Sequence, residues 1–144
     1  NIKITCSKEP EAMGTAGPIK LAEEHLLQLG EDGLFFVFNS DIVCDYPLQE
    51  MIDFQKTHKA EGTIVLSSVE DPSRFGVVVT DEHGQVQRFV EKPKEFISNK
   101  INAGIYLLST RVIKRVPLRF CMIEKEVFPE MAKDGQLYSI SLKK

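Results

Sequence analysis

Two spacings of apolar residues alternate along this chain. Consecutive or alternating apolar residues predict strands at 34–38, 62–69, 77–80, 86–90, 101–109 and 137–142. Apolar residues three or four positions apart predict helices at 18–29, after Pro47 and at 123–134, with Gly30, Gly33 and Gly135 at helix ends. A shorter alternation, Ile2, Ile4 and Cys6, predicts one more strand at the beginning of the sequence.

The regular succession of strands and helices indicates the fold class. It favours an α/β domain in which helices cover both faces of a mostly parallel sheet. Residues 34–38 are continuously apolar, which is typical of a strand covered on both faces. Residues 77–80 and 86–90 flank the turn residues Asp81 and Gly84, so this part of the chain is predicted to form an inserted β-hairpin.

Composition narrows the class of protein. A length of 144 residues with 42% hydrophobic residues suits one packed domain. A net charge of -3 with acids and bases interspersed gives no basic stripe, so neither a nucleic acid nor a membrane is an expected partner, and we expect a cytoplasmic protein. The three cysteines and three histidines are scattered, which argues against disulfides and against a zinc site.

Asp41 is the first candidate for chemistry. It lies three residues beyond the last residue of the apolar run 34–38, and ligands of open α/β sheets bind outside the carboxyl ends of the strands. A carboxylate at that place could hold a divalent cation against phosphate oxygens. The alternative is an ordinary turn, because Asn, Ser and Asp all favour chain reversals.

Two further segments carry candidate residues. The sequence MGTAGP, at 13–18, is a loop of small residues before a predicted helix, where free backbone N–H groups could meet an anion or the polar edge of a base. The sequence FVEKP, at 89–93, places Glu91 and Lys92 at the end of a strand, where one could face hydroxyls and the other a phosphate. An ordinary turn and a solvated charge pair are the alternatives.

Six segments occur in an order and at intervals that resemble one enzyme family. They are EPEAMGTAGP, NSDIVCDYP, RFGVVV, RFVEKP, NKINAGIYLLS and IEKEVFPEMAKDGQLY. Together they resemble the sugar-phosphate nucleotidylyltransferases, and within them the mannose-1-phosphate guanylyltransferase branch of the catalytic β type. The resemblance covers nearly the whole chain.

The resemblance implies a Rossmann-like domain that joins GTP and mannose 1-phosphate into GDP-mannose, releases pyrophosphate and requires Mg²⁺. Carried over by position, Asp41 matches the family's metal-binding aspartate, and Lys92 matches the lysine that contacts the sugar phosphate. Glu91 matches the acid that holds sugar hydroxyls. The remaining matches are Gly76, Asn102 and Gly104 in the sugar pocket, and Glu9 and Gly14 where the family recognises the nucleobase.

The carboxylate of Glu9 also bears on the identity of the base. A carboxylate only accepts hydrogen bonds, which suits the adjacent N1–H and N2–H₂ donors of guanine better than the single imide N–H of uracil or thymine. This favours a guanine nucleotide over a uridylyl- or thymidylyltransferase of the glucose 1-phosphate type. The alternative for Glu9 is a solvated loop acid. A non-catalytic regulatory subunit that binds GDP-mannose is a third reading, disfavoured because Asp41 and Lys92 are intact.

The chain departs from the family pattern at both ends. It lacks the glycine-rich triphosphate loop, the later aspartate that shares the metal, and the carboxy-terminal β-helix. Residues 1–144 are therefore expected to form a partial catalytic domain that is nearly inactive alone, since each lost transition-state contact can cost a factor of roughly 10² to 10³. The expected assembly is a homo-oligomer, with a regulatory paralogue as a further partner.

Overall fold

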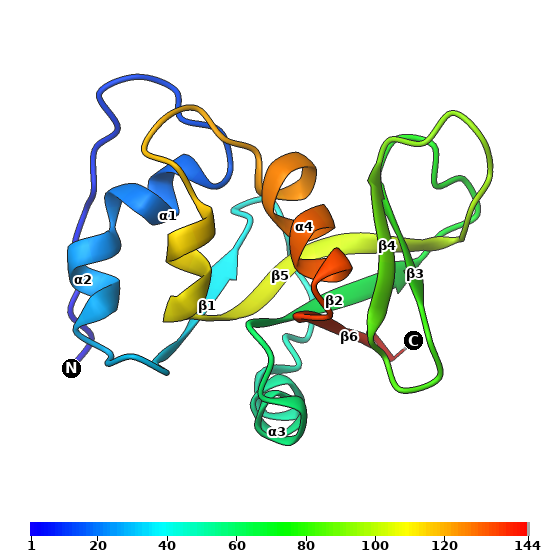
Figure 1. The fold of residues 1–144 in the computed structure, drawn as a ribbon, viewed down its shortest axis with the longest axis horizontal. Helices are drawn as coiled ribbons and strands as arrows, with labels where there is room; N and C mark the ends of the chain where they lie inside the picture. The colour runs from blue at the N-terminus through cyan, green and yellow to red at the C-terminus, as the bar shows by residue number, and fades with distance from the viewer. Residues whose placement is uncertain (144) are drawn as a thin grey trace.

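The fold is a single mixed sheet with helices on both faces (Figure 1). The structure, a computed structural model, describes residues 1–143. Its strands are β1 (Leu34–Phe38), β2 (Gly62–Ser68), β3 (Gly76–Thr80), β4 (Val86–Glu91), β5 (Lys100–Ser109) and β6 (Leu137–Ser141). Its helices are α1 (Gly17–Leu21), α2 (Glu23–Leu27), α3 (Leu48–His58), the 3₁₀-helix η1 (Thr110–Arg115), the π-helix η2 (Ile123–Val127) and α4 (Phe128–Lys133).

Strand β5 is the centre of the sheet. The order is β4-β3-β5-β2-β6, and β1 also pairs with β5. Only β2 and β6 run parallel, whereas β1, β2 and β3 are antiparallel to β5, and β3 is antiparallel to β4. The predicted α/β class and the β3–β4 hairpin are confirmed. Mostly parallel pairing was expected, but the sheet is mixed, because the central strand β5 runs antiparallel to β1, β2 and β3.

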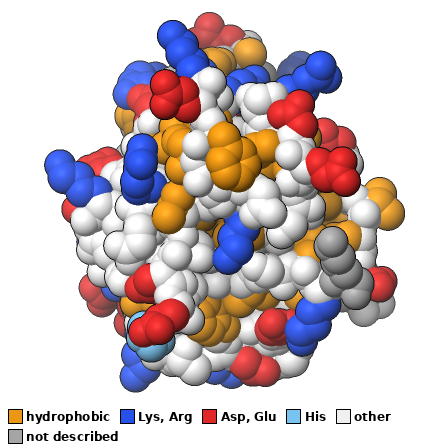
Figure 2. Space-filling view, turned by 90° about the vertical axis from the view of Figure 1, so that its right-hand side faces the viewer, with side chains coloured by type: hydrophobic (Ala, Val, Ile, Leu, Met, Phe, Trp, Pro, Cys, Tyr) orange, Lys and Arg blue, Asp and Glu red, His pale blue; other side chains and the backbone are white. Residues whose placement is uncertain are grey.

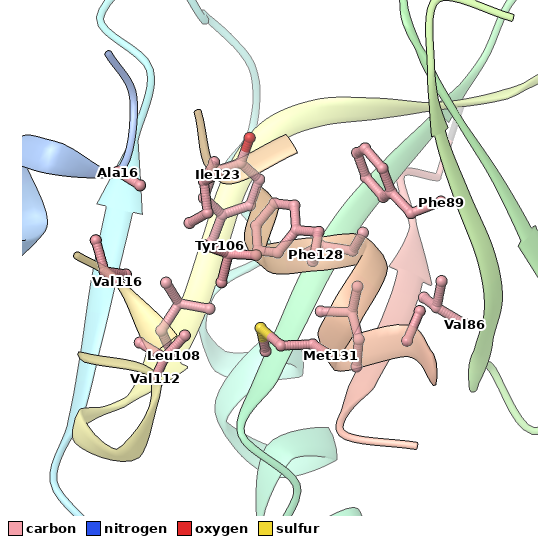
Figure 3. Packing of buried hydrophobic residues seen from close by; sticks show 14 of the residues in the cluster. Ala16, Val86, Phe89, Tyr106, Leu108, Val112, Val116, Ile123, Phe128 and Met131 are labelled. Carbon is pink, nitrogen blue, oxygen red and sulfur yellow. The ribbon is translucent and has the colours of Figure 1, made fainter. Parts of the chain in front are cut away.

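Two hydrophobic clusters lie on opposite faces of the sheet. Ile64, Leu66, Tyr106 and Leu108 belong to the larger one, which also takes side chains from α1, η1, η2 and α4. Figure 3 shows Tyr106 packed against Phe128 of α4, and their rings meet edge to face at 4.8 Å. The alternate residues Val65, Ile105 and Leu107 pack against Met51 of α3 on the other face. The period of two along β2 and β5 thus explains helices on both faces.

Three predicted elements differ from the structure. Residues 2–6 are exposed and form no strand, because their alternation finds no neighbouring strand to pair with within residues 1–143. The predicted helix at 18–29 is broken at Ala22 into α1 and α2. Strand β1 forms as predicted, but it is only half-buried, and within residues 1–143 it pairs with β5 alone. Its second edge is therefore open.

The surface carries no dominant charge of one sign on the side seen in Figure 2, which is the side of the β3–β4 hairpin. Basic and acidic side chains are interspersed there, with apolar groups between them. Among residues 1–143, no helix has the length and apolarity that crossing a bilayer requires.

Candidate functional site

The sheet splits along one edge of β5, and the candidate site lies at this split. Strand β3 pairs with β5 at Ile101, whereas β1 pairs with it from Ile105 onward on the same edge. Residues 102–104 of β5 lie between the two neighbours. On the opposite edge, the β2–β5 register shifts between Ile64 and Leu66, which marks a β-bulge at the same place. Bulges and splits of this kind often present side chains to a ligand.

Gly104 and Asn102 close the split towards β1. Gly104 has φ of +76°, and a Cβ there would lie 2.6 Å from Nδ2 of Asn39. Its N–H donates to Oδ1 of Asn102 at 3.0 Å, and the Asn39 N–H donates to the Gly104 carbonyl at 2.9 Å. Nδ2 of Asn102 in turn donates to the Tyr106 hydroxyl at 2.7 Å. Only glycine at 104 allows the Asn39 side chain to approach the backbone of β5 so closely.

Gly76, Glu91 and Lys92 form the other wall, where the hairpin reaches the split. Gly76 pairs with Glu91, and a Cβ on Gly76 would lie 2.8 Å from a carboxylate oxygen of Glu91. The Lys92 N–H donates to the Phe75 carbonyl at 3.1 Å, and Lys92 adopts φ of +46°. A lysine in this left-handed conformation costs on the order of 1 kcal/mol, and such strain gathers at functional positions.

A buried carboxylate, Glu124 of η2, lies close to this wall. Burial first, and then the charge of Glu124, raise the pKa of Glu91, while the Lys92 ammonium works in the opposite direction. Burial raises the pKa of Tyr106 as well, and the charges of Glu124 and Glu91 add to that effect. The split therefore holds two carboxylates that repel each other next to a hydroxyl. Such a site favours a ligand that donates hydrogen bonds.

The small-residue loop 13–17 is bound to the segment before η2. Cys121 donates its N–H to the Met13 carbonyl at 3.0 Å and accepts from the Ala16 N–H at 2.9 Å. Gly14 has φ of +74°, and a Cβ on it would lie 2.5 Å from the Cys121 carbonyl oxygen. Thr15 then connects the loop to Glu124, because its hydroxyl donates to Glu124 Oε2 at 2.7 Å. The loop is thus attached to the same buried carboxylate that borders the split.

Glu9 and Asp41 lie outside this network of contacts. Oε2 of Glu9 accepts the Met13 N–H at 2.9 Å, so one oxygen of this exposed side chain stabilises its own loop. Asp41 is exposed and follows Asn39 by two residues. No group of three or more His, Cys, Asp or Glu side chains that could hold a metal is found in residues 1–143. One exposed carboxylate still fits Mg²⁺, which commonly uses one or two carboxylates together with substrate phosphates.

Of the residues proposed from the sequence, the structure brings together Gly76, Glu91, Asn102 and Gly104, with Lys92 adjoining Glu91. Gly14 joins the set through the loop and Glu124. Sequence reasoning missed the side chains that organise the split: Asn39, Tyr106, Glu124 and Thr15. The sequence did contain a signal for two of them. Asn39 begins the Asn-Ser-Asp turn, and Glu124 lies in the IEKE segment that carries part of the family resemblance.

A family model described as nucleotidyl transferase matches residues 1–143. This chain belongs to the nucleotidyl transferase family. The resemblance drawn from the six sequence segments is therefore confirmed, and so is the Rossmann-like α/β fold class.

Individual members of the nucleotidyl transferase family agree with this assignment. The chain is 55% identical over 143 residues to the probable mannose-1-phosphate guanylyltransferase 3 of Arabidopsis thaliana, covering 98% of this chain and 43% of that protein. It is 54% identical over 142 residues to the mannose-1-phosphate guanyltransferase beta-A of Xenopus laevis, covering 98% of this chain and 39% of that protein. The chain thus spans about two fifths of the length of these relatives.

Among solved structures, HddC from Yersinia pseudotuberculosis complexed with GMP-PN has a TM-score of 0.71 and 27% sequence identity. The match covers 94% of this chain and 56% of HddC. A protein with the same fold has therefore been crystallised in complex with GMP-PN.

Proposed function

We propose that this chain belongs to a mannose-1-phosphate guanylyltransferase and forms the part of its catalytic domain that binds GDP-mannose. The reaction transfers GMP from GTP to mannose 1-phosphate, giving GDP-mannose and pyrophosphate. The observation that carries the proposal is the identity of 54–55% over 98% of the chain to proteins of that name. The acceptor-rich split in the sheet supports it, because hexose hydroxyls are donors that two carboxylates can bind.

The residues at the split suggest a division of tasks. Glu91 accepts hydrogen bonds from the hexose hydroxyls, and Gly76 and Gly104 leave room for the ring because neither carries a side chain. The Lys92 ammonium orients the phosphate of the hexose 1-phosphate. One oxygen of that phosphate attacks the α-phosphorus of GTP, a new P–O bond forms, and the bond to the pyrophosphate leaving group breaks. No protein nucleophile is needed, so the protein contributes position and charge.

Asp41 is the proposed Mg²⁺ ligand, and the ion would offset negative charge on the nucleotide phosphates. Glu9 and Gly14 are the proposed contacts to guanine, with the second carboxylate oxygen of Glu9 left for the base. An assembly with further copies, or with a regulatory paralogue, stays a prediction for this chain.

Two alternatives share the same fold. A uridylyl- or thymidylyltransferase of the glucose 1-phosphate type would use the same phosphate chemistry with another base, and the Glu9 carboxylate argues against it. A regulatory subunit would bind GDP-mannose without catalysis. The presence of both Asp41 and Lys92, the residues that the reaction would use, argues against that reading.

The test is calorimetric titration of GDP-mannose and of UDP-glucose into the folded chain, with and without Mg²⁺. We expect GDP-mannose to bind and UDP-glucose to bind at least about tenfold more weakly, because charge-assisted hydrogen bonds to guanine are each worth roughly 1.5–3 kcal/mol. Glu9→Gln should weaken GDP-mannose binding by about tenfold. Asp41→Asn should remove the effect of Mg²⁺ on affinity.

Matched controls are available in the same loops. Glu11→Gln and Asp45→Asn change exposed acids close to Glu9 and Asp41 and should leave binding unchanged. Equal affinity for the two nucleotide sugars would refute the guanine assignment. No binding to a chain that circular dichroism shows to be folded would refute the proposal that this part of the protein carries the product site.

A further inference from the structure

Glu124 is a buried carboxylate to which the family resemblance assigned no role. Only 7% of its surface is exposed, and it lies in the π-helix η2, directly after the segment that holds the loop 13–17. Short π-helical turns are rare and frequently lie at functional sites. A carboxylate this deeply buried costs free energy unless hydrogen bonds or charge compensate it. The groups that compensate the Glu124 carboxylate therefore indicate the role of this residue.

One of those groups is Thr15. The Thr15 hydroxyl donates to Glu124 Oε2 at 2.7 Å and accepts the Ile123 N–H at 2.9 Å. Together with the two backbone hydrogen bonds between Cys121 and residues 13 and 16, this pair attaches the loop to the start of η2. The position of the loop, and with it Gly14, depends on the orientation of one carboxylate.

The other oxygen of Glu124 is accessible to solvent. No buried side-chain oxygen within residues 1–143 lacks a hydrogen-bond partner, and Thr15 bonds to Oε2, so Oε1 keeps access to solvent. The charge of Glu124 acts on both Glu91 and Tyr106, which border the split. Oε1 is thus placed to accept a hydrogen bond from a ligand that Glu91 also holds.

We propose that Glu124 couples the two halves of the site, with one oxygen holding Thr15 of the loop 13–17 and the other accepting a hydroxyl of the hexose. This inference rests on the proposed function, because it takes the loop as the base-binding element and the split as the sugar pocket. A hexose hydroxyl offsets the repulsion between Glu124 and Glu91 and fixes the carboxylate that holds the loop. Occupation of the sugar pocket therefore strengthens binding of the base, and by linkage the reverse is also true.

The experiment measures this coupling with two probes that each fill one half of the site. Guanosine carries the base without a phosphate, so it does not repel the phosphate of mannose 1-phosphate. Guanosine affinity is measured from amide chemical shifts of the folded chain, first alone and then with saturating mannose 1-phosphate. We expect mannose 1-phosphate to tighten guanosine binding about fivefold in the wild-type chain.

Substitutions at the two partners should remove the coupling. Thr15→Val keeps the shape of the side chain and removes the hydroxyl, so the ratio of the two guanosine affinities should fall to about one, whereas Thr15→Ser should restore it. Glu124→Gln should lower the ratio and also weaken mannose 1-phosphate binding. Thr57→Val and Glu130→Gln, exposed positions on α3 and α4, are matched controls that should keep the wild-type ratio.

The outcomes separate the two proposals. If the folded wild-type chain binds neither guanosine nor mannose 1-phosphate, the proposed function fails and the coupling fails with it. If both probes bind but do not affect each other, or if Thr15→Val keeps the wild-type ratio, only the inference about Glu124 is overturned. Retained coupling in Thr15→Val together with loss in Thr15→Ser would overturn it as well.

Discussion

Two buried polar networks in this molecule are built in opposite ways. On the α3 side of the sheet, the Ala60 N–H donates to Nδ1 of His58 at 3.0 Å, and Nε2 of His58 lies 2.7 Å from the Thr63 hydroxyl. Thr63 donates to Oε1 of Gln55 at 2.7 Å, and Nε2 of Gln55 donates back to the Ala60 carbonyl at 2.6 Å. Each donor in this ring meets one acceptor. At the split, in contrast, two carboxylates repel each other.

The difference between the two networks indicates the role of each one. A closed ring of hydrogen bonds leaves nothing for a ligand to satisfy, so the ring around His58 stabilises the attachment of α3 to β2. A surplus of acceptors costs stability in the free protein and is offset when a donor arrives. The comparison predicts that substitutions in the first network change mainly stability, and that substitutions in the second change mainly binding.

The largest effect on stability is expected from opening the closed ring with Thr63→Val. Thr63 is fully buried, and its loss leaves a Gln55 oxygen and a His58 N–H without partners. We expect the free energy of unfolding in urea to fall by about 2–3 kcal/mol. Thr57→Val, on the exposed side of α3, should stay within about 0.5 kcal/mol of the wild type. Equal effects of the two substitutions would contradict the closed ring.

A smaller effect is expected from protonating the same ring. Burial lowers the pKa of His58 to about 4, and protonation of Nδ1 would also set two donors against each other at Ala60. The unfolded chain binds a proton near pH 6.5 and the folded chain does not, so stability falls as the pH drops from about 7 towards 4. Because His58 is half-exposed, we expect it to contribute about 1 kcal/mol of that loss by pH 5.

The pH effect is measured by comparing urea unfolding at pH 7 and pH 5 in three proteins. His58→Gln should lose about 1 kcal/mol less than the wild type on acidification, whereas the exposed His83→Gln should behave as the wild type does. A His58 ring that titrates near pH 6.5 in NMR spectra of the folded chain would disprove the assignment.

The smallest effect on stability, with the opposite sign, is expected at the split. Glu91→Gln removes one of two carboxylates that repel each other, so the free energy of unfolding should stay unchanged or rise by up to about 0.5 kcal/mol. The same variant should bind GDP-mannose more weakly, because the sugar loses its charged acceptor. A clear loss of stability without a loss of affinity, in paired urea and calorimetry measurements, would show that the split is a structural network like the ring.

The elements of this fold were predictable from the sequence where a local hydrophobic pattern repeated over several residues. The β3–β4 hairpin, β5 and the parallel partners β2 and β6 follow from alternation, turn residues and β-branched side chains. The apolar run of β1 identified a strand, but it could not tell that the strand would be half-buried with one open edge. That outcome depends on which strands come to lie beside it, which no local pattern encodes.

The candidate site shows the same limit. Glu91 was proposed from its place at the end of a predicted strand, and Asn102 and Gly104 were proposed from the family resemblance; the structure places all three at the split. Asn39 and Glu124 were missed because their roles depend on contacts between residues far apart in the chain. The bulge in β5, which brings Asn102 and Gly104 to the split, depends on the register with β2.

The attachment of the loop 13–17 has a consequence for how the molecule folds and opens. Thr15 and Glu124 are separated by 109 positions in the sequence, so their hydrogen bond closes a long loop and its formation costs more conformational entropy than a local contact would. Met13 and Ala16 of the loop are buried in the core beside this contact, so the loop is expected to open only together with the parts of the fold that it packs against.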